Sequence, residues 1–335
     1  MKHLQVSPYK IDKNLPDKIK NLKETEIPNN VTKLDEYCFA GCERLSKITF
    51  STNLEVLDKF AFYDCLSLIT INLPTFITKI GKSCFENCTS LKSITLPTSL
   101  LEIGPCAFKN CNNLSTIAIP KNIRKISSSC FEHCIRLTSI DIPMGVKYID
   151  ERAFKECGQL SSITIPESVR SIGNSCFESC ASLISIILPK YVNVIPQSCF
   201  EKCYSLVLIR MSEDVKYIRA RAFNDCTKLT YIELPKNLKM IEQKVFNGDL
   251  TIVYNNAEYV LDKRYYAEEQ ELITALNITP DNDKSAIQRY TAQLLILYNF
   301  IDFENFAIEF PVLKNIKTDK PKGWNVWPFK SKTEN

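Results

Sequence analysis

Residues 84–104, CFENCTSLKSITLPTSLLEIG, recur in altered form 23 positions later as residues 107–126, AFKNCNNLSTIAIPKNIRKI. A phenylalanine marks this period along most of the chain, at positions 39, 62, 85, 108, 131, 154, 177, 200, 223 and 246. Chance does not place ten phenylalanines on one period without an insertion, so the chain consists largely of internal repeats. Because a unit of this size cannot bury its own apolar side chains, neighbouring units must stack and share a continuous core.

The second half of each unit predicts a short strand. Residues 93–95 (Ser-Ile-Thr) and 139–141 (Ser-Ile-Asp) place one isoleucine between two polar residues, which is the pattern of a half-buried strand. Pro97 and Pro143 follow closely and end these strands, because proline lacks the amide hydrogen that a sheet needs. The repeats therefore predict a strand-rich solenoid over residues 31–254.

The repeated frame A/C-F-x-x-C-x-x-L-x-x-I-x-L-P-x-x-V-x-x-I-G resembles the BspA-type leucine-rich repeat, which is known from surface and interaction proteins of bacteria and anaerobic protozoa. The resemblance covers roughly residues 4–254 and implies an α/β-type, strand-rich leucine-rich-repeat solenoid. Pro16 stands where the repeat phenylalanine is expected, so residues 1–30 are predicted to be degenerate capping repeats. The resemblance also implies a recognition function without naming a ligand, because a shared fold does not carry a shared site.

The fifteen cysteines follow the repeat as well. Nine stand three residues after the phenylalanine, and five stand directly before it, which gives C-x-x-x-C pairs such as Cys84 and Cys88. Such pairs suit metal binding or disulfides. However, the position before the phenylalanine also holds Ala61 and Ala107, which indicates a small buried residue. Cysteines stacked in register also have poor geometry for disulfides. We expect buried free thiols, with disulfides and metal binding as the alternatives.

Thiols in this number, with no apolar leader in the first residues, predict a cytoplasmic protein. The expected function is a non-enzymatic protein-interaction scaffold that uses the repeat surface. A surface-displayed adhesin or ligand-binding protein is the alternative that the resemblance allows.

Catalytic motifs are missing from the sequence. The eight glycines form neither a dinucleotide-binding loop nor a phosphate-binding loop. Only two histidines exist, His3 and His133, and the positions equivalent to His133 hold variable polar residues, so His133 is predicted to be a turn residue. The sequence therefore predicts no enzyme, no cofactor and no metal site. A net charge of +4 gives no reason to expect nucleic acid, and no apolar stretch is long enough to cross a membrane.

The outward positions of the strands are where recognition is expected. In the middle repeats they hold mostly small hydroxyl residues, whereas toward the C-terminal end they change to residue types that dominate protein interfaces. The candidate partner-binding residues there are Ile187, Leu208, Arg210, Tyr231 and Glu233. The alternative is that the C-terminal residues of this chain cover them.

A stripe of basic residues follows the proline turn of the repeats. It could bind an acidic partner or phosphate, and the alternative is that it is a solvent-exposed side of the solenoid without a binding role. Its members are Lys79, Arg124, Lys125, Lys147, Arg170, Lys216 and Lys239.

The period stops after Tyr254. Apolar residues at three- and four-residue steps in 265–276 and 287–301 predict amphipathic helices, so residues 255–313 are expected to form a small helical C-terminal cap. Residues 314–335 form a basic tail with six lysines against two acidic residues. Trp324 and Trp327 lie in this tail and are candidates for docking a partner, or else pack on the cap.

Overall fold

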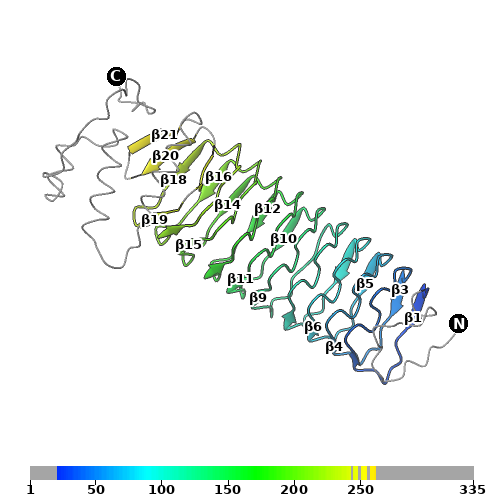
Figure 1. Ribbon diagram of the computed structural model, residues 1–335. Helices are drawn as coiled ribbons and strands as arrows, with labels where there is room; N and C mark the ends of the chain where they lie inside the picture. Colours follow the sequence, from blue (N-terminus) through cyan, green and yellow to red (C-terminus); the bar gives the residue numbers. More distant parts are fainter. Residues whose placement is uncertain (1–20, 243, 248–249, 255–256, 262–335) are drawn as a thin grey trace, which may run out of the picture.

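The computed structural model describes residues 21–242, 244–247, 250–254 and 257–261. These residues form an elongated solenoid in which each 23-residue unit is one turn (Figure 1). The described residues contain strands and turns and no helix, so the strand-rich prediction is confirmed. The expected helices and both tryptophans of the tail, Trp324 and Trp327, lie outside the described residues.

One side of the solenoid carries a row of three-residue strands, here called the long-strand row. Its members are β1 (Glu24–Glu26), β3 (Lys47–Thr49), β5 (Thr70–Asn72), β7 (Ser93–Thr95), β10 (Ser139–Asp141), β12 (Ser162–Thr164), β14 (Ser185–Ile187), β16 (Leu208–Arg210) and β18 (Tyr231–Glu233). Between β7 and β10, the equivalent unit contributes an isolated bridge from Ala118 to Asp141.

A second row of two-residue strands, the short-strand row, follows the proline turn of each unit. Its members are β2 (Lys33–Leu34), β4 (Val56–Leu57), β6 (Lys79–Ile80), β8 (Glu102–Ile103), β9 (Lys125–Ile126), β11 (Tyr148–Ile149), β13 (Ser171–Ile172), β15 (Val194–Ile195), β17 (Tyr217–Ile218) and β19 (Met240–Ile241). Paired strands in both rows are parallel and shifted by one repeat, as in the pairs of Ile140 with Ile163 and Leu57 with Ile80.

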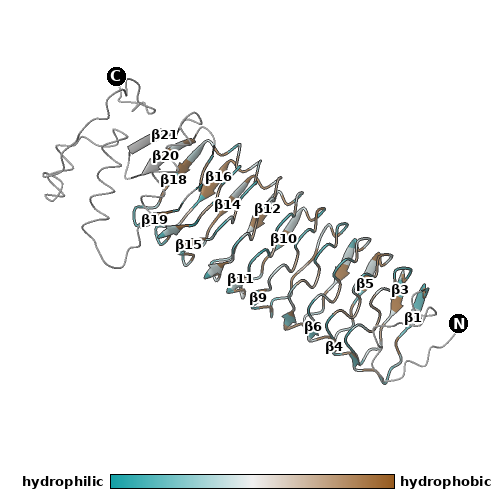
Figure 2. Ribbon diagram, viewed as in Figure 1, coloured by the Kyte–Doolittle hydropathy of each residue, from teal (hydrophilic) through white to brown (hydrophobic). Residues whose placement is uncertain are grey.

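The phenylalanines form the centre of the core. Phe62 to Phe223 are at most 1% exposed at every repeat, and neighbouring rings stack with centroids 5.3 to 5.6 Å apart. From the turn of Phe39 to that of Phe223, two residues in each phenylalanine turn have a left-handed backbone, such as Ser129 (φ 53°) and His133 (φ 62°). In Figure 2 apolar, brown segments recur next to paler or teal ones along the units, as this periodic burial requires.

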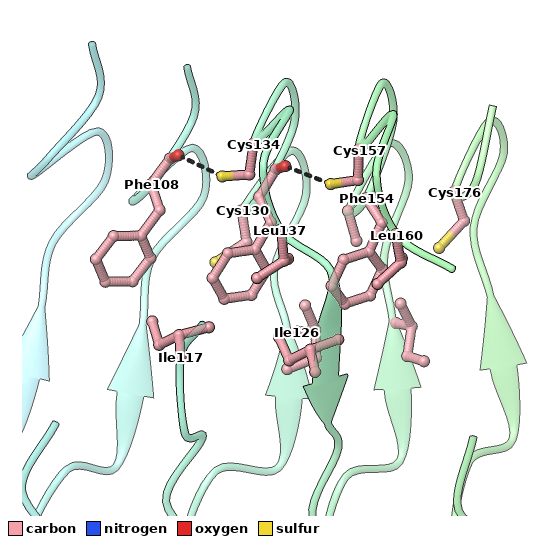
Figure 3. Close-up of a cluster of buried hydrophobic side chains, with 14 of the residues drawn as sticks. Phe108, Ile117, Ile126, Cys130, Cys134, Leu137, Phe154, Cys157, Leu160 and Cys176 are labelled. Carbon is pink, nitrogen blue, oxygen red and sulfur yellow. Dashed lines mark hydrogen bonds between the residues drawn. The ribbon is translucent and has the colours of Figure 1, made fainter. Parts of the chain in front are cut away.

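Eight of the cysteines that stand three residues after a phenylalanine have a defined partner. Cys134 Sγ donates to the carbonyl oxygen of Phe108 at 3.2 Å, and Cys157 Sγ to that of Phe131 at 3.1 Å (Figure 3). The same bond forms at Cys65, Cys88, Cys111, Cys180, Cys203 and Cys226. Each of these carbonyl oxygens also accepts a hydrogen bond from a backbone amide in the same phenylalanine turn, so the thiol of the next unit donates to the second lone pair of the oxygen. Cysteine is thus the small residue that can both pack and donate here.

All fifteen cysteines lie in the described residues, where no disulfide links them; fourteen are buried and Cys106 is partly exposed. Within the described residues, no group of histidine, cysteine and carboxylate side chains is arranged to hold a metal ion. In the same residues no helix has the length and apolar character that crossing a membrane requires.

The C-terminal end of the long-strand row differs from the prediction. β20 (Leu250–Tyr254) continues the row in parallel with β18, and β21 (Ala257–Leu261) pairs with β20 in the antiparallel direction. Residues 257–261, at the start of the expected helical cap of residues 255–313, therefore form a strand, and the helices expected at 265–276 and 287–301 lie outside the described residues. The physical reason is that the last strand of the row exposes unpaired backbone groups, which an added strand can satisfy.

The N-terminal end begins with a complete unit in the described residues. β1 pairs with β3 over its full length, and Ile27, which is buried, donates its amide to Thr49 at 2.8 Å. Residues 1–20, which include the rest of the predicted N-terminal cap, lie outside the described residues.

Candidate protein-interaction surface

The long-strand row presents two side chains per unit to solvent. In β10, Ile140 faces the core while Ser139 and Asp141 are exposed, and the same pattern holds at β5, β7, β12, β14, β16 and β18. Because the register is constant, outward residues of neighbouring units lie side by side. The row is therefore a regular wall on which equivalent residues form columns.

The middle of this wall is small and polar, and some of its hydroxyls are already bonded within it. Thr95 Oγ1 donates to Asn72 Oδ1 at 3.2 Å, and Ser161 Oγ lies 3.4 Å from the carbonyl oxygen of Thr138. Groups paired in this way offer little to a partner, so the middle wall has few features to recognise.

Toward the C-terminal end the wall becomes apolar over three neighbouring strands, β14, β16 and β18. We call the exposed hydrophobic residues there the apolar patch: Ile184 (55% exposed), Ile187 (59%), Val207 (51%), Leu208 (41%) and Tyr231 (45%). Leu208 pairs with Ser185, and the amide of Val207 bonds the carbonyl of Ile184 at 2.8 Å, so these side chains belong to adjacent units. β16 also packs beside β18.

Charged residues stand at the edge of the apolar patch. Arg210 pairs in register with Ile187, and Glu233 pairs with Val253 of β20. Both are exposed, and within the part of the chain that the structure describes neither side chain forms an ion pair. The five residues singled out by the sequence in this region thus lie on one face, as the repeat register predicted.

Ile184 and Val207 were not predicted as part of this surface. Each precedes the first residue of its strand, where other units hold Ser115, Thr138 and Ser161. Aligning the units would have shown the exchange of a hydroxyl residue for an aliphatic one at that position. The signal was present, but strand alternation alone does not show that this residue faces outward.

His133 does not form a catalytic pair with a cysteine. Its Nε2 lies 3.7 Å from Glu156 Oε2, and both side chains are more than 40% exposed. The neighbouring Cys134 thiol points inward and bonds Phe108, and burial raises its pKa well above the usual range. A buried thiol that keeps its proton is a poor nucleophile. His133 is therefore an exposed turn residue and Cys134 a residue of the core.

The chain is similar to several leucine-rich-repeat proteins of known structure. No curated protein matches the chain. It is similar to the crystal structure of a leucine-rich repeat protein from Bacteroides ovatus, with 24% identity over 69% of this chain and 80% of that chain and a TM-score of 0.41. It is similar to a leucine rich cell surface protein from Faecalibacterium prausnitzii, with 25% identity, coverages of 70% and 79%, and a TM-score of 0.45.

A leucine rich repeat protein of T. pallidum is similar as well, with 26% identity, coverages of 62% and 78%, and a TM-score of 0.41. The family described as the BspA type leucine rich repeat region matches residues 10–138 and 124–253, in six copies. These residues make up most of the chain and contain all ten repeat phenylalanines. The chain belongs to the BspA-type leucine-rich-repeat family.

Proposed function

We propose that this protein is a non-enzymatic interaction module that binds a protein partner through the apolar patch. The observation that carries the proposal is the gathering of five exposed hydrophobic side chains on, or directly before, three adjacent strands, next to the small and polar middle wall. Contiguous apolar surface on a soluble protein marks interaction sites, because leaving it in water is unfavourable.

The composition of the patch also suits a protein partner. Tyr231 and Arg210 are residue types that often contribute most of an interface's binding energy, and the aliphatic side chains supply the area that a partner would cover. Parallel strands in a fixed register hold the backbone of this surface in place. Binding a partner therefore costs little conformational entropy on this side of the interface.

The compartment we propose is the reducing cytoplasm. The support is that most thiols are buried within the phenylalanine core, and eight of them donate to backbone carbonyls. The second candidate function is that of a surface-displayed binding protein, because the similar protein from F. prausnitzii is a leucine rich cell surface protein.

Site-specific photo-cross-linking in the cells that make the protein tests the proposed function. A photoreactive phenylalanine analogue at position 208 should capture a defined protein, whereas the same analogue at position 139 on the middle wall should not. Equal capture at both positions, or at neither, would contradict the proposal. Fractionation of the same cells decides between the cytoplasm and the surface.

A further inference from the structure

The basic stripe divides into residues that are neutralised and residues that are not. Lys79 lies 3.0 Å from Glu102, and Lys125 lies 2.6 Å from Asp150, so two of its members are paired with carboxylates. Arg124, Lys147 and Arg170, by contrast, are exposed and form no ion pair within the described part of the chain. We call these three residues the basic row.

The basic row is a continuous column on three consecutive units, next to β9, β11 and β13. The amide of Lys147 bonds the carbonyl of Arg124 at 2.9 Å, and the amide of Arg170 bonds that of Lys147 at 2.9 Å. With units spaced about 4.8 Å apart, the two arginines begin about 10 Å from each other with the lysine between them. The row thus presents three like charges on a straight line.

Both arginines are held over the following unit. Arg124 Nη1 donates to the carbonyl of Lys121 at 2.8 Å and lies so close to Gly145 that a Cβ there would collide with it. Arg170 lies over the ring of Tyr191, 5.5 Å from its centroid. Gly145 and Tyr191 occupy the same repeat position two units apart, so the two guanidinium groups lean in the same direction. A fixed guanidinium loses less freedom on binding than a mobile one.

Apolar surface is interleaved with these charges. Met144 is 71% exposed, Tyr148 47% and Tyr191 55%. Lys190 lies 6.0 Å from the Tyr191 ring, so cations approach that ring from two units. A ligand that offers only negative charge would leave Met144 and Tyr148 unused, whereas a peptide with both acidic and apolar side chains would cover them.

We propose that the basic row and its neighbours Met144, Tyr148 and Tyr191 bind an acidic peptide segment of a partner protein that carries apolar side chains between its carboxylates. This surface lies beside the short-strand row and is separate from the apolar patch on the long-strand row. The two surfaces can therefore be tested independently, and loss of one does not predict loss of the other.

Fluorescence anisotropy with a labelled synthetic peptide of alternating glutamate and leucine tests this proposal on the full chain. The double change Arg124→Glu and Arg170→Glu should weaken binding about tenfold or more, which is about 1.4 kcal/mol. The matched control is Lys59→Glu with Lys82→Glu, which alters the net charge equally at exposed lysines elsewhere on the solenoid. Only the first pair should weaken binding, and the affinity of the wild-type protein should fall as salt rises.

Other outcomes would overturn the proposal. Equal weakening by both pairs would show attraction by net charge alone. Tighter binding of single-stranded polyuridylate than of the peptide would show a nucleic-acid surface. Residues 262–313 of this chain hold nine acidic against four basic residues and are the competing occupant. If the full chain does not bind the peptide, and a carbodiimide links Lys147 to that segment, the surface serves this chain itself.

Discussion

Replacing Phe131 by alanine should be one of the most damaging single changes in this chain. The ring is fully buried and stacks on Phe108 and on Phe154 with centroids 5.6 Å away on each side. Replacing a buried phenylalanine by alanine lowers the free energy of unfolding by about 3–5 kcal/mol. Because this ring stacks on two neighbours, we expect a loss near the upper end of that range. Neighbouring units alone support the core of a solenoid, so the cavity cannot be closed by distant elements.

Urea unfolding followed by circular dichroism and by tyrosine fluorescence measures this loss, and agreement of the two signals checks that the solenoid unfolds as one unit. His133→Ala in the same turn is the control, and it should change the free energy of unfolding by less than about 0.5 kcal/mol because its side chain is 42% exposed. Similar losses from the two variants would refute the assignment of the phenylalanine column to the core.

Two further predictions concern the thiols. A thiol reagent should modify Cys106 alone in the native protein and close to fifteen cysteines in denaturant, and recovery of fewer than about ten would indicate disulfides. Stability should also fall steeply above about pH 8.5, the ordinary cysteine pKa, because burial raises the pKa of Cys84, Cys130 and Cys176 and only the unfolded chain then releases these protons. Changing these three cysteines to alanine should reduce the dependence of the unfolding free energy on pH by about 4 kcal/mol per pH unit. Melting temperatures of the two proteins at pH 8 and pH 10 measure this difference. An equal fall in melting temperature for the wild-type and the variant would contradict the prediction.

Much of the fold follows from one number, the repeat length. A period of 23 residues places Ile140 beside Ile163 and Phe108 beside Phe131, and both alignments are found. The sequence also located the outward-facing residues at the C-terminal end, because the side-chain period of a strand and a constant register determine which face a residue occupies.

Other features depend on contacts that a repeat pattern does not contain. The pattern shows that cysteine recurs after each phenylalanine, but only the structure shows that Cys134 bonds the carbonyl of the preceding unit. Likewise, the sequence of the basic stripe does not show that Lys125 forms an ion pair with Asp150 while Lys147 forms none in the described part of the chain. The strand β21 was missed because the repeat ends before it, and its formation depends on the edge that β20 leaves.

Binding of the cross-linked partner to purified variants tests the central claim most directly. Tyr231→Ala and Arg210→Ala should each weaken the complex by more than about 1 kcal/mol, whereas Ser139→Ala with Ser162→Ala on the middle wall should change it by less than about 0.5 kcal/mol. Deleting residues 314–335, which contain Trp324 and Trp327, should leave the affinity unchanged. The account is contradicted if binding survives the Tyr231 and Arg210 changes but is lost with the tail, or if those changes lower the melting temperature and leave the affinity intact.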